Sequence, residues 1–214
     1  FSNFSFSDLT SYTFIKENKG LILQYKDNNI FFLAFVFLTI TVLLNVLLSP
    51  MFLPTLVIGF IFDKWVGTLI IVFGNTLGAV LLYLLAKTFF SELIEKKFAI
   101  KFANLKKLFN KNEMIYFMFF RFVGGGGTPF PIQNVLPVIF NMSVKNYIIA
   151  TFLGIIPATF VTVALGSGIG NIIDQNIELS FWSVFFSPEI YLPIIGFLIL
   201  FIVAFVVKKI YFKK

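Results

Sequence analysis

An apolar stretch at residues 114–140 is interrupted near its middle by an arginine, four glycines and a pair of prolines. Arg121 is the only arginine among the 17 basic residues of the chain. Glycine and proline do not favour continuation of a helix, and a broken backbone at membrane depth is tolerated only where it is buried in protein or lines a polar cavity. We therefore predict that this stretch enters the membrane, breaks and turns back. Its glycines are Gly124, Gly125, Gly126 and Gly127, and its prolines are Pro129 and Pro131.

The residue composition is that of an integral membrane protein, because 58% of the 214 residues are hydrophobic and 13% are charged. The chain has no cysteine and no histidine, which removes thiolate and imidazole ligands and the usual proton shuttle. We therefore expect no metal, no cofactor and no enzymatic activity. Frequent Phe, Lys, Asn and Ile suggest an AT-rich bacterial genome and a location in the cytoplasmic membrane. Residues 1–29 are too polar for the apolar region of a signal peptide, so we expect no cleavable signal.

Four apolar stretches are each long enough to cross the hydrocarbon core of a bilayer as a helix. The predicted fold is therefore an all-α polytopic membrane protein with four transmembrane helices, at residues 31–48, 66–90, 147–168 and 190–207. Residues 49–65 are too short to cross and are punctuated by Pro50, Pro54 and Gly59. We predict two re-entrant hairpins, near residues 49–65 and 114–141.

The lysines indicate the orientation of these segments. They gather before the first crossing, at residues 91–113 and after the last crossing, whereas residues 171–189 contain acidic residues and no base. Short basic loops face the cytoplasm, so we expect both termini to be cytoplasmic and the two hairpins to face opposite ways, as an inverted repeat. The chain then divides into a cytoplasmic segment at 1–30, a membrane domain at 31–170, and an extracytoplasmic loop, last helix and basic tail at 171–214.

Small residues mark close packing along two of the predicted crossings. Gly74 and Gly78 form a GxxxG pattern, and Ala150, Gly154, Ala158, Thr162 and Gly166 recur every fourth residue. Such faces commonly serve tight helix packing. They also leave formation of a homo-oligomer open.

Arg121 is the main candidate for a functional side chain. A guanidinium at membrane depth is costly unless it meets an anion, carbonyl groups or water, and its planar fork matches phosphate or carboxylate. In the functional interpretation it captures an anion, helped by backbone NH groups of the glycine run, while Asn75, Gln133 and Asn134 line a polar route. In the structural interpretation it binds carbonyls at the broken helix ends or pairs with Asp63.

Asp63 has two interpretations of its own. It is either a solvated residue in the turn of the first hairpin, or a proton or cation site opposite Arg121.

The basic segment at 91–113 mixes lysines with apolar residues and is predicted to be an amphipathic helix that contacts anionic lipid headgroups. A nucleic-acid role would need an accessible soluble basic domain, and we expect none.

Two segments, 48–87 and 121–168, resemble the DedA or VTT-domain superfamily, also called SNARE-associated Golgi proteins, and are most similar to its Tvp-type branch. The residues that carry the resemblance are Pro54, Gly59, Phe62, Gly67, Gly74 and Gly78, then Arg121, Pro129, Phe130, Pro131 and Asn134, then Gly154, Pro157, Leu165, Gly166 and Ser167. The resemblance implies two re-entrant hairpins that meet within the membrane, and transport of lipid or lipid phosphate.

The chain departs from DedA proper at two places. Gly127 stands where DedA has a second arginine, and Ser49 and Pro50 stand where it has an acidic residue. These differences weaken the implied proton coupling and undecaprenyl phosphate specificity. The expected function is movement of phospholipid or a lipid phosphate between leaflets, as a scramblase. The alternatives are a proton-coupled carrier of a small anion and a membrane scaffold without transport.

Overall fold

The computed structural model describes residues 12–98, 100, 102, 103, 106, 109, 112–123, 128–174, 186–188, 190–196, 198, 199 and 202. Within these residues the elements are helical and no strand occurs. The elements are α2 (Tyr12–Asn28), α3 (Ile30–Val46), α4 (Phe52–Phe89), α5 (Ser91–Phe98), α7 (Glu113–Phe122), α8 (Phe130–Val135), the 3-10 helix η2 (Leu136–Val138) and α9 (Val144–Asp174).

Two helices of the described part are long and apolar enough to cross a membrane, Phe52–Phe89 and Val144–Asn171. A third span arises only if Asn18–Asn28 and Ile30–Val46, which meet at an angle of 101°, are counted as one. The prediction of an all-helical membrane protein is therefore confirmed. The predicted fourth crossing, 190–207, lies partly outside the described residues.

Helix α4 is folded back on itself at Asp63, whose φ of 66° and ψ of 178° break the helix. We call residues 52–62 the short limb and residues 64–89 the long limb. The limbs lie side by side, because a Cβ built on Gly67 of the long limb would be 3.3 Å from the carbonyl oxygen of Ile58 on the short limb. Aspartate is one of the few side chains that tolerate a positive φ, because its carboxylate can bond to the nearby backbone.

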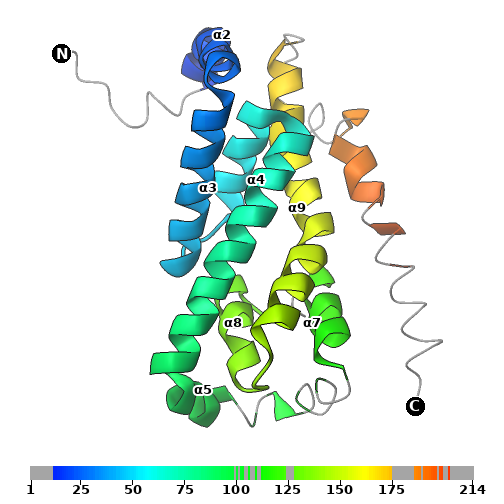
Figure 1. Ribbon diagram of the computed structural model, residues 1–214. Helices are drawn as coiled ribbons and strands as arrows, with labels where there is room; N and C mark the ends of the chain where they lie inside the picture. The colour runs from blue at the N-terminus through cyan, green and yellow to red at the C-terminus, as the bar shows by residue number, and fades with distance from the viewer. Residues whose placement is uncertain are drawn as a thin grey trace.

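Helix α3 reaches only part of the way along the long limb of α4 (Figure 1). Near its end, Asn45 lies against Gly78, where an added Cβ would be 2.5 Å from the Asn45 Cβ. The long limb continues about 16 Å beyond Gly78 at 1.5 Å per residue. The chain then turns at residues 47–51 and returns along the short limb. The first hairpin therefore consists of α3 and the short limb, with its tip at residues 47–51, and differs from the hairpin expected within residues 49–65.

The second hairpin consists of α7 and α8, which enter from the opposite end of the bundle (Figure 1). Each hairpin is followed by a long helix, the long limb of α4 in one half and α9 in the other. The returning arm of each hairpin carries a proline in its first turn, Pro54 in the short limb and Pro131 in α8. Proline is tolerated there because the first NH groups of a helix have no intrahelical partner. The two halves thus have the same order of elements and enter the bundle from opposite ends, which agrees with the predicted inverted repeat.

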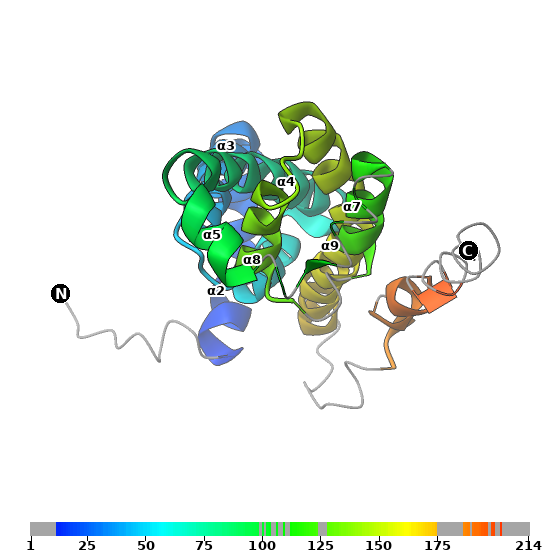
Figure 2. The ribbon, with the colours of Figure 1, turned by 90° about the horizontal axis from the view of Figure 1, so that it is seen from below.

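Helices α2 and α5 lie at opposite ends of the bundle, and α5 lies at one side of the lower end (Figures 1 and 2). The charge pattern predicted that the lysines of the N-terminal segment and those of the basic segment at 91–113 lie on one side of the membrane. In the structure they belong to different ends, because α3 is an arm of a hairpin and does not carry the chain to the far end. The N-terminal segment and the basic loop therefore lie at opposite ends of the bundle, and their placement on the two sides of the membrane stays a prediction. The basic C-terminal tail lies outside the described residues.

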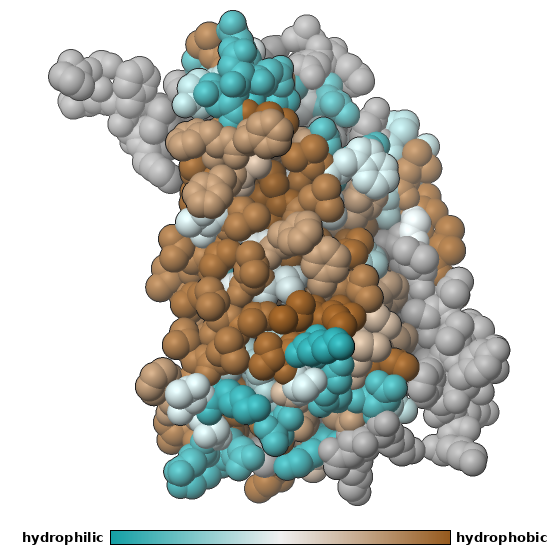
Figure 3. Space-filling view, in the orientation of Figure 1, coloured by the Kyte–Doolittle hydropathy of each residue, from teal (hydrophilic) through white to brown (hydrophobic). Residues whose placement is uncertain are grey.

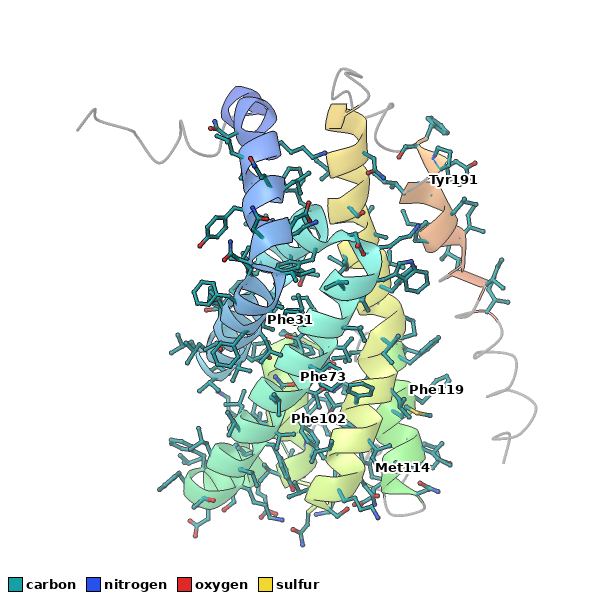
Figure 4. All side chains as sticks on the ribbon, turned by 45° about the horizontal axis from the view of Figure 1, so that its top comes forward. Phe31, Phe73, Phe102, Met114, Phe119 and Tyr191 are labelled. Carbon is teal, nitrogen blue, oxygen red and sulfur yellow. The ribbon has the colours of Figure 1, made fainter. Side chains whose placement is uncertain are left out.

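On the face shown in Figure 3, an apolar band lies between two polar ends. Phe31 on α3 and Phe73 on the long limb, both labelled in Figure 4, are 89% and 48% exposed. Exposed aromatic and aliphatic side chains of this kind are compatible with a lipid environment.

Small residues allow the close crossings. A Cβ on Gly59 of the short limb would overlap the carbonyl oxygen of Val163 on α9, and one on Gly166 would overlap that of Leu56. The tight packing predicted for the small-residue faces is thus found between the short limb and α9, and between the long limb and α3.

Candidate functional site

A pocket of about 280 Å³ lies where the tips of the two hairpins meet α9. Met51, Phe52 and Thr55 from the first hairpin line it, together with Arg121, Phe130 and Gln133 from the second. The remaining walls are Asn75 of the long limb and Ile155, Ala158, Thr159 and Thr162 of α9. The lining is therefore mostly apolar or hydroxylic, with one cation.

Helix α7 positions the cation. Its N-terminus is capped by Asn112, whose side chain accepts a hydrogen bond from the Ile115 NH at 3.1 Å. Nine residues later the helix presents Arg121, the next-to-last residue before its end. Gly154 on α9 lets the two helices approach, because a Cβ there would be 2.7 Å from the Arg121 Cβ. The guanidinium is thus held at the tip of the second hairpin and is only 2% exposed.

Neutral groups bind the guanidinium. Nη2 donates to Asn134 Oδ1 at 2.6 Å and to the Tyr147 hydroxyl at 3.1 Å, and Nη1 donates to Gln133 Oε1 at 3.4 Å. The Cζ atom lies 4.8 Å from the ring centre of Phe117 and 4.9 Å from that of Phe130, within cation–π range.

Within the described residues, Arg121 forms no ion pair with a carboxylate, and its Nε has no hydrogen-bond partner. Desolvating an ion costs several kcal/mol when no opposite charge compensates it. Amide and hydroxyl partners supply part of that compensation. The remaining positive charge favours an anion in the adjoining pocket.

A chain of side-chain amides joins this cation to the first hairpin. Asn134 Nδ2 donates to Asn45 Oδ1 at 3.4 Å, and Asn45 Nδ2 donates to Asn75 Oδ1 at 2.5 Å. All three asparagines are buried. The chain therefore links α8, α3 and the long limb of α4 at the depth of the hairpin tips.

The structure brings together Arg121, Gln133, Asn134 and Asn75, and their role in binding or transport stays a prediction. Pro129 caps the start of α8, and Pro131 lies in its first turn. Gly124, Gly125, Gly126 and Gly127 lie outside the described residues.

Asp63 is placed elsewhere. It is exposed at the bend between the limbs of α4, where its Oδ1 accepts hydrogen bonds from the NH groups of Trp65 at 2.7 Å and Val66 at 3.3 Å. It caps the long limb and does not contact Arg121. Pro50 lies at the tip of the first hairpin, and Gly59 packs on α9.

Two polar side chains that are hydrogen-bonded around Arg121 and Asn134 were not among the predicted site residues, and neither were the apolar and threonine residues that line the pocket. Asn45 is a single polar residue near the end of an apolar helix. Tyr147 lies near the start of α9, where its hydroxyl also donates toward the carbonyl oxygens of Ala79 and Asn134, at 3.2 Å each. The signal for Asn45 was its polarity within a stretch that was expected to cross the membrane, whereas nothing in the sequence separates Tyr147 from an interfacial tyrosine.

Comparison with known proteins identifies the family. The model of the VTT domain matches residues 47–168. The chain belongs to the VTT-domain family. Its VTT domain begins at the tip of the first hairpin and contains both limbs of α4, the second hairpin and most of α9. The resemblance to the DedA or VTT superfamily is thereby confirmed, and its Tvp-type branch stays a prediction.

A curated relative of this VTT-domain protein is the "Transmembrane protein 41 homolog" of Dictyostelium discoideum, which is 31% identical over 166 residues. The match covers 74% of this chain and 48% of the relative, so the chain spans about half the length of that protein. No solved structure matches.

Proposed function

We propose that this VTT-domain protein moves phospholipid or a lipid phosphate between the leaflets of its membrane. Arg121 holds the phosphate, and Gln133, Asn134 and Asn75 line the polar route past the hairpin tips. The NH groups of the glycine run 124–127 are proposed as further donors. The observation that carries the proposal is the buried guanidinium in the wall of the pocket, which has no carboxylate partner among the described residues.

The surroundings of the pocket suit an amphiphile. Phe52 lines the pocket and is 59% exposed, and its neighbour Leu53 is 70% exposed, so this side borders the apolar surface of the bundle. A lipid bound here keeps its chains against apolar side chains while its phosphate reaches Arg121. The volume of about 280 Å³ is at the lower limit of the roughly 300–1,000 Å³ that encloses a drug-sized ligand. It therefore suits a headgroup with the acyl chains outside.

Reconstitution tests the proposal. Purified protein is placed in liposomes that carry a fluorescent phospholipid in both leaflets, and a membrane-impermeant quencher is added outside. Empty liposomes should lose about half of the fluorescence, and protein-containing liposomes should lose nearly all of it. Equal losses in both preparations would contradict the proposal.

The proton-coupled anion carrier gains no support from the position of Asp63, which caps a helix at the end of the bundle. The scaffold hypothesis depends on the basic segment, where Lys96 and Lys97 of α5 are exposed. We propose that this end contacts anionic lipid headgroups. The bacterial cytoplasmic membrane is likewise a proposed location, supported by residue usage alone, and the relative described above comes from a eukaryote.

A further inference from the structure

The amide chain between Arg121 and Asn75 has a direction that can be read from chemistry. A guanidinium only donates hydrogen bonds, so Asn134 must turn its Oδ1 toward Arg121. Its Nδ2 then donates to Asn45 Oδ1, and Asn45 in turn donates from Nδ2 to Asn75 Oδ1. Every donor in the chain points away from the arginine.

An independent contact fixes the same direction. Asn45 Nδ2 also donates to the backbone carbonyl of Thr41 at 3.3 Å, and a carbonyl can only accept. Asn45 therefore presents its NH₂ group to both Thr41 and Asn75. The contact with Thr41 gives this orientation without reference to Arg121. Asn75 is left with its oxygen engaged and its own NH₂ group pointing away from Asn45.

The two residues at the ends of this series of amide hydrogen bonds, Arg121 and Asn75, line the same pocket. Asn75 is 6% exposed, and none of the hydrogen bonds among the described residues uses its Nδ2. Arg121, in the facing wall, has an Nε without a partner. Arg121 Nε is buried without a partner, which is costly. Asn75 has an amide donor that no described residue uses and lines the pocket, so this donor is available to an anion there.

We propose that Asn75 Nδ2 is a second donor to the bound phosphate, and that Asn45 and Asn134 are positioning residues that hold this donor toward the pocket. The phosphate oxyanion is then bound by Arg121 from one half of the inverted repeat and by Asn75 from the other. This inference rests on the proposed lipid site and adds the contribution of the first half to it.

Binding to the purified full chain in detergent tests the inference without transport. The probes are dihexanoyl phosphatidylglycerol and inorganic phosphate, each titrated by calorimetry. Asn75→Leu should weaken binding of the phospholipid about tenfold, because a hydrogen bond to a charged group is lost. Thr76→Val is the matched control, since Thr76 is the next residue, is also buried and does not line the pocket. It should leave the affinity unchanged.

The positioning role predicts non-additivity. Asn45→Leu should weaken binding severalfold in the native chain and cause no further loss when combined with Asn75→Leu. If Asn45 only stabilises the fold, Asn45→Leu should weaken binding further in the double variant as well. If Asn75→Leu does not fold, Asn75→Asp replaces it, because aspartate keeps the acceptor toward Asn45 and cannot donate.

Three results would overturn the inference: no binding of either probe to the native chain, native affinity in a well-folded Asn75→Leu or Asn75→Asp variant, or additive losses in the double variant. Displacement of the phospholipid by inorganic phosphate would assign the site to phosphate in general, and lack of displacement would assign it to a lipid headgroup. Loss of affinity in Asn75→Leu with no leaflet exchange in liposomes would uphold the second donor and reject the transport proposal.

Discussion

Asn45 and Arg121 occupy matching places in the two halves of the inverted repeat. Each is the next-to-last residue of the first arm of a hairpin, α3 in one half and α7 in the other. Each lies against a glycine of the long helix that follows, Gly78 for Asn45 and Gly154 for Arg121. The site is therefore built from equivalent positions, of which one carries an amide and the other a charge.

The fork of Arg121 should be required for transport. We expect Arg121→Lys to lose most leaflet exchange per folded molecule, because lysine keeps the charge but cannot bind Asn134 and a phosphate with a planar pair of donors. Arg121→Gln should lose the exchange as well. Exchange in liposomes and thermal stability in detergent, measured on the same samples, separate loss of the site from loss of the fold. Full transport in a well-folded Arg121→Gln variant would remove the central residue of the proposal.

Gly154→Ala should disturb the site through packing alone. The added methyl group would lie 2.7 Å from both the Arg121 Cβ and the Met118 carbonyl oxygen, so α7 must move away from α9. We expect a loss of about 1–3 kcal/mol in stability, as for other overpacked positions, and reduced exchange in the molecules that remain folded. Thermal melting in detergent gives the first quantity. Gly20→Ala is the control, because nothing lies within 4 Å of a Cβ at that position.

Asp63 should act as a cap and not as a coupling site. Asp63→Asn keeps an oxygen for the NH groups of Trp65 and Val66, and asparagine tolerates the φ of 66°. Stability and leaflet exchange should both stay near native values. Asp63→Ala loses the cap and places a methyl side chain at positive φ, so it should cost about 1–2 kcal/mol in stability. Uptake of a labelled anion that depends on a pH gradient and disappears in Asp63→Asn would instead favour the anion carrier.

The two ends of the bundle should be accessible from opposite sides of the membrane. The chain has no cysteine, so single cysteines can be added at exposed positions without competing thiols. Gly20→Cys on α2 and Glu95→Cys on α5 should react with a membrane-impermeant maleimide from different sides of sealed vesicles. Labelling of both from one side would favour the four-crossing layout that the lysine pattern predicted.

The sequence indicated the surroundings of Arg121 because this residue is chemically exceptional. A single arginine followed by glycines and prolines indicated a broken, membrane-embedded segment, and the amides Gln133 and Asn134 follow it closely in the chain. The place of α3 in the bundle could not be predicted from its length. Eighteen apolar residues satisfy the criterion for a crossing, whereas the depth at which α3 stops depends on its packing against Gly78. That packing brings Asn45 to Asn134, 89 residues away, and no local pattern reports such a distance.

The polar contacts of Arg121 also have a consequence for biogenesis. In a chain that enters the bilayer N-terminal end first, Asn45 finds Asn75 within its own half, 30 residues later, so its NH₂ group is bound before the second half has been made. Arg121 depends on Asn134 and on Tyr147, which is 26 residues further along the chain at the start of α9. Helix α7 is therefore poorly suited to remain in lipid by itself, and we expect its stable insertion to follow synthesis of the start of α9.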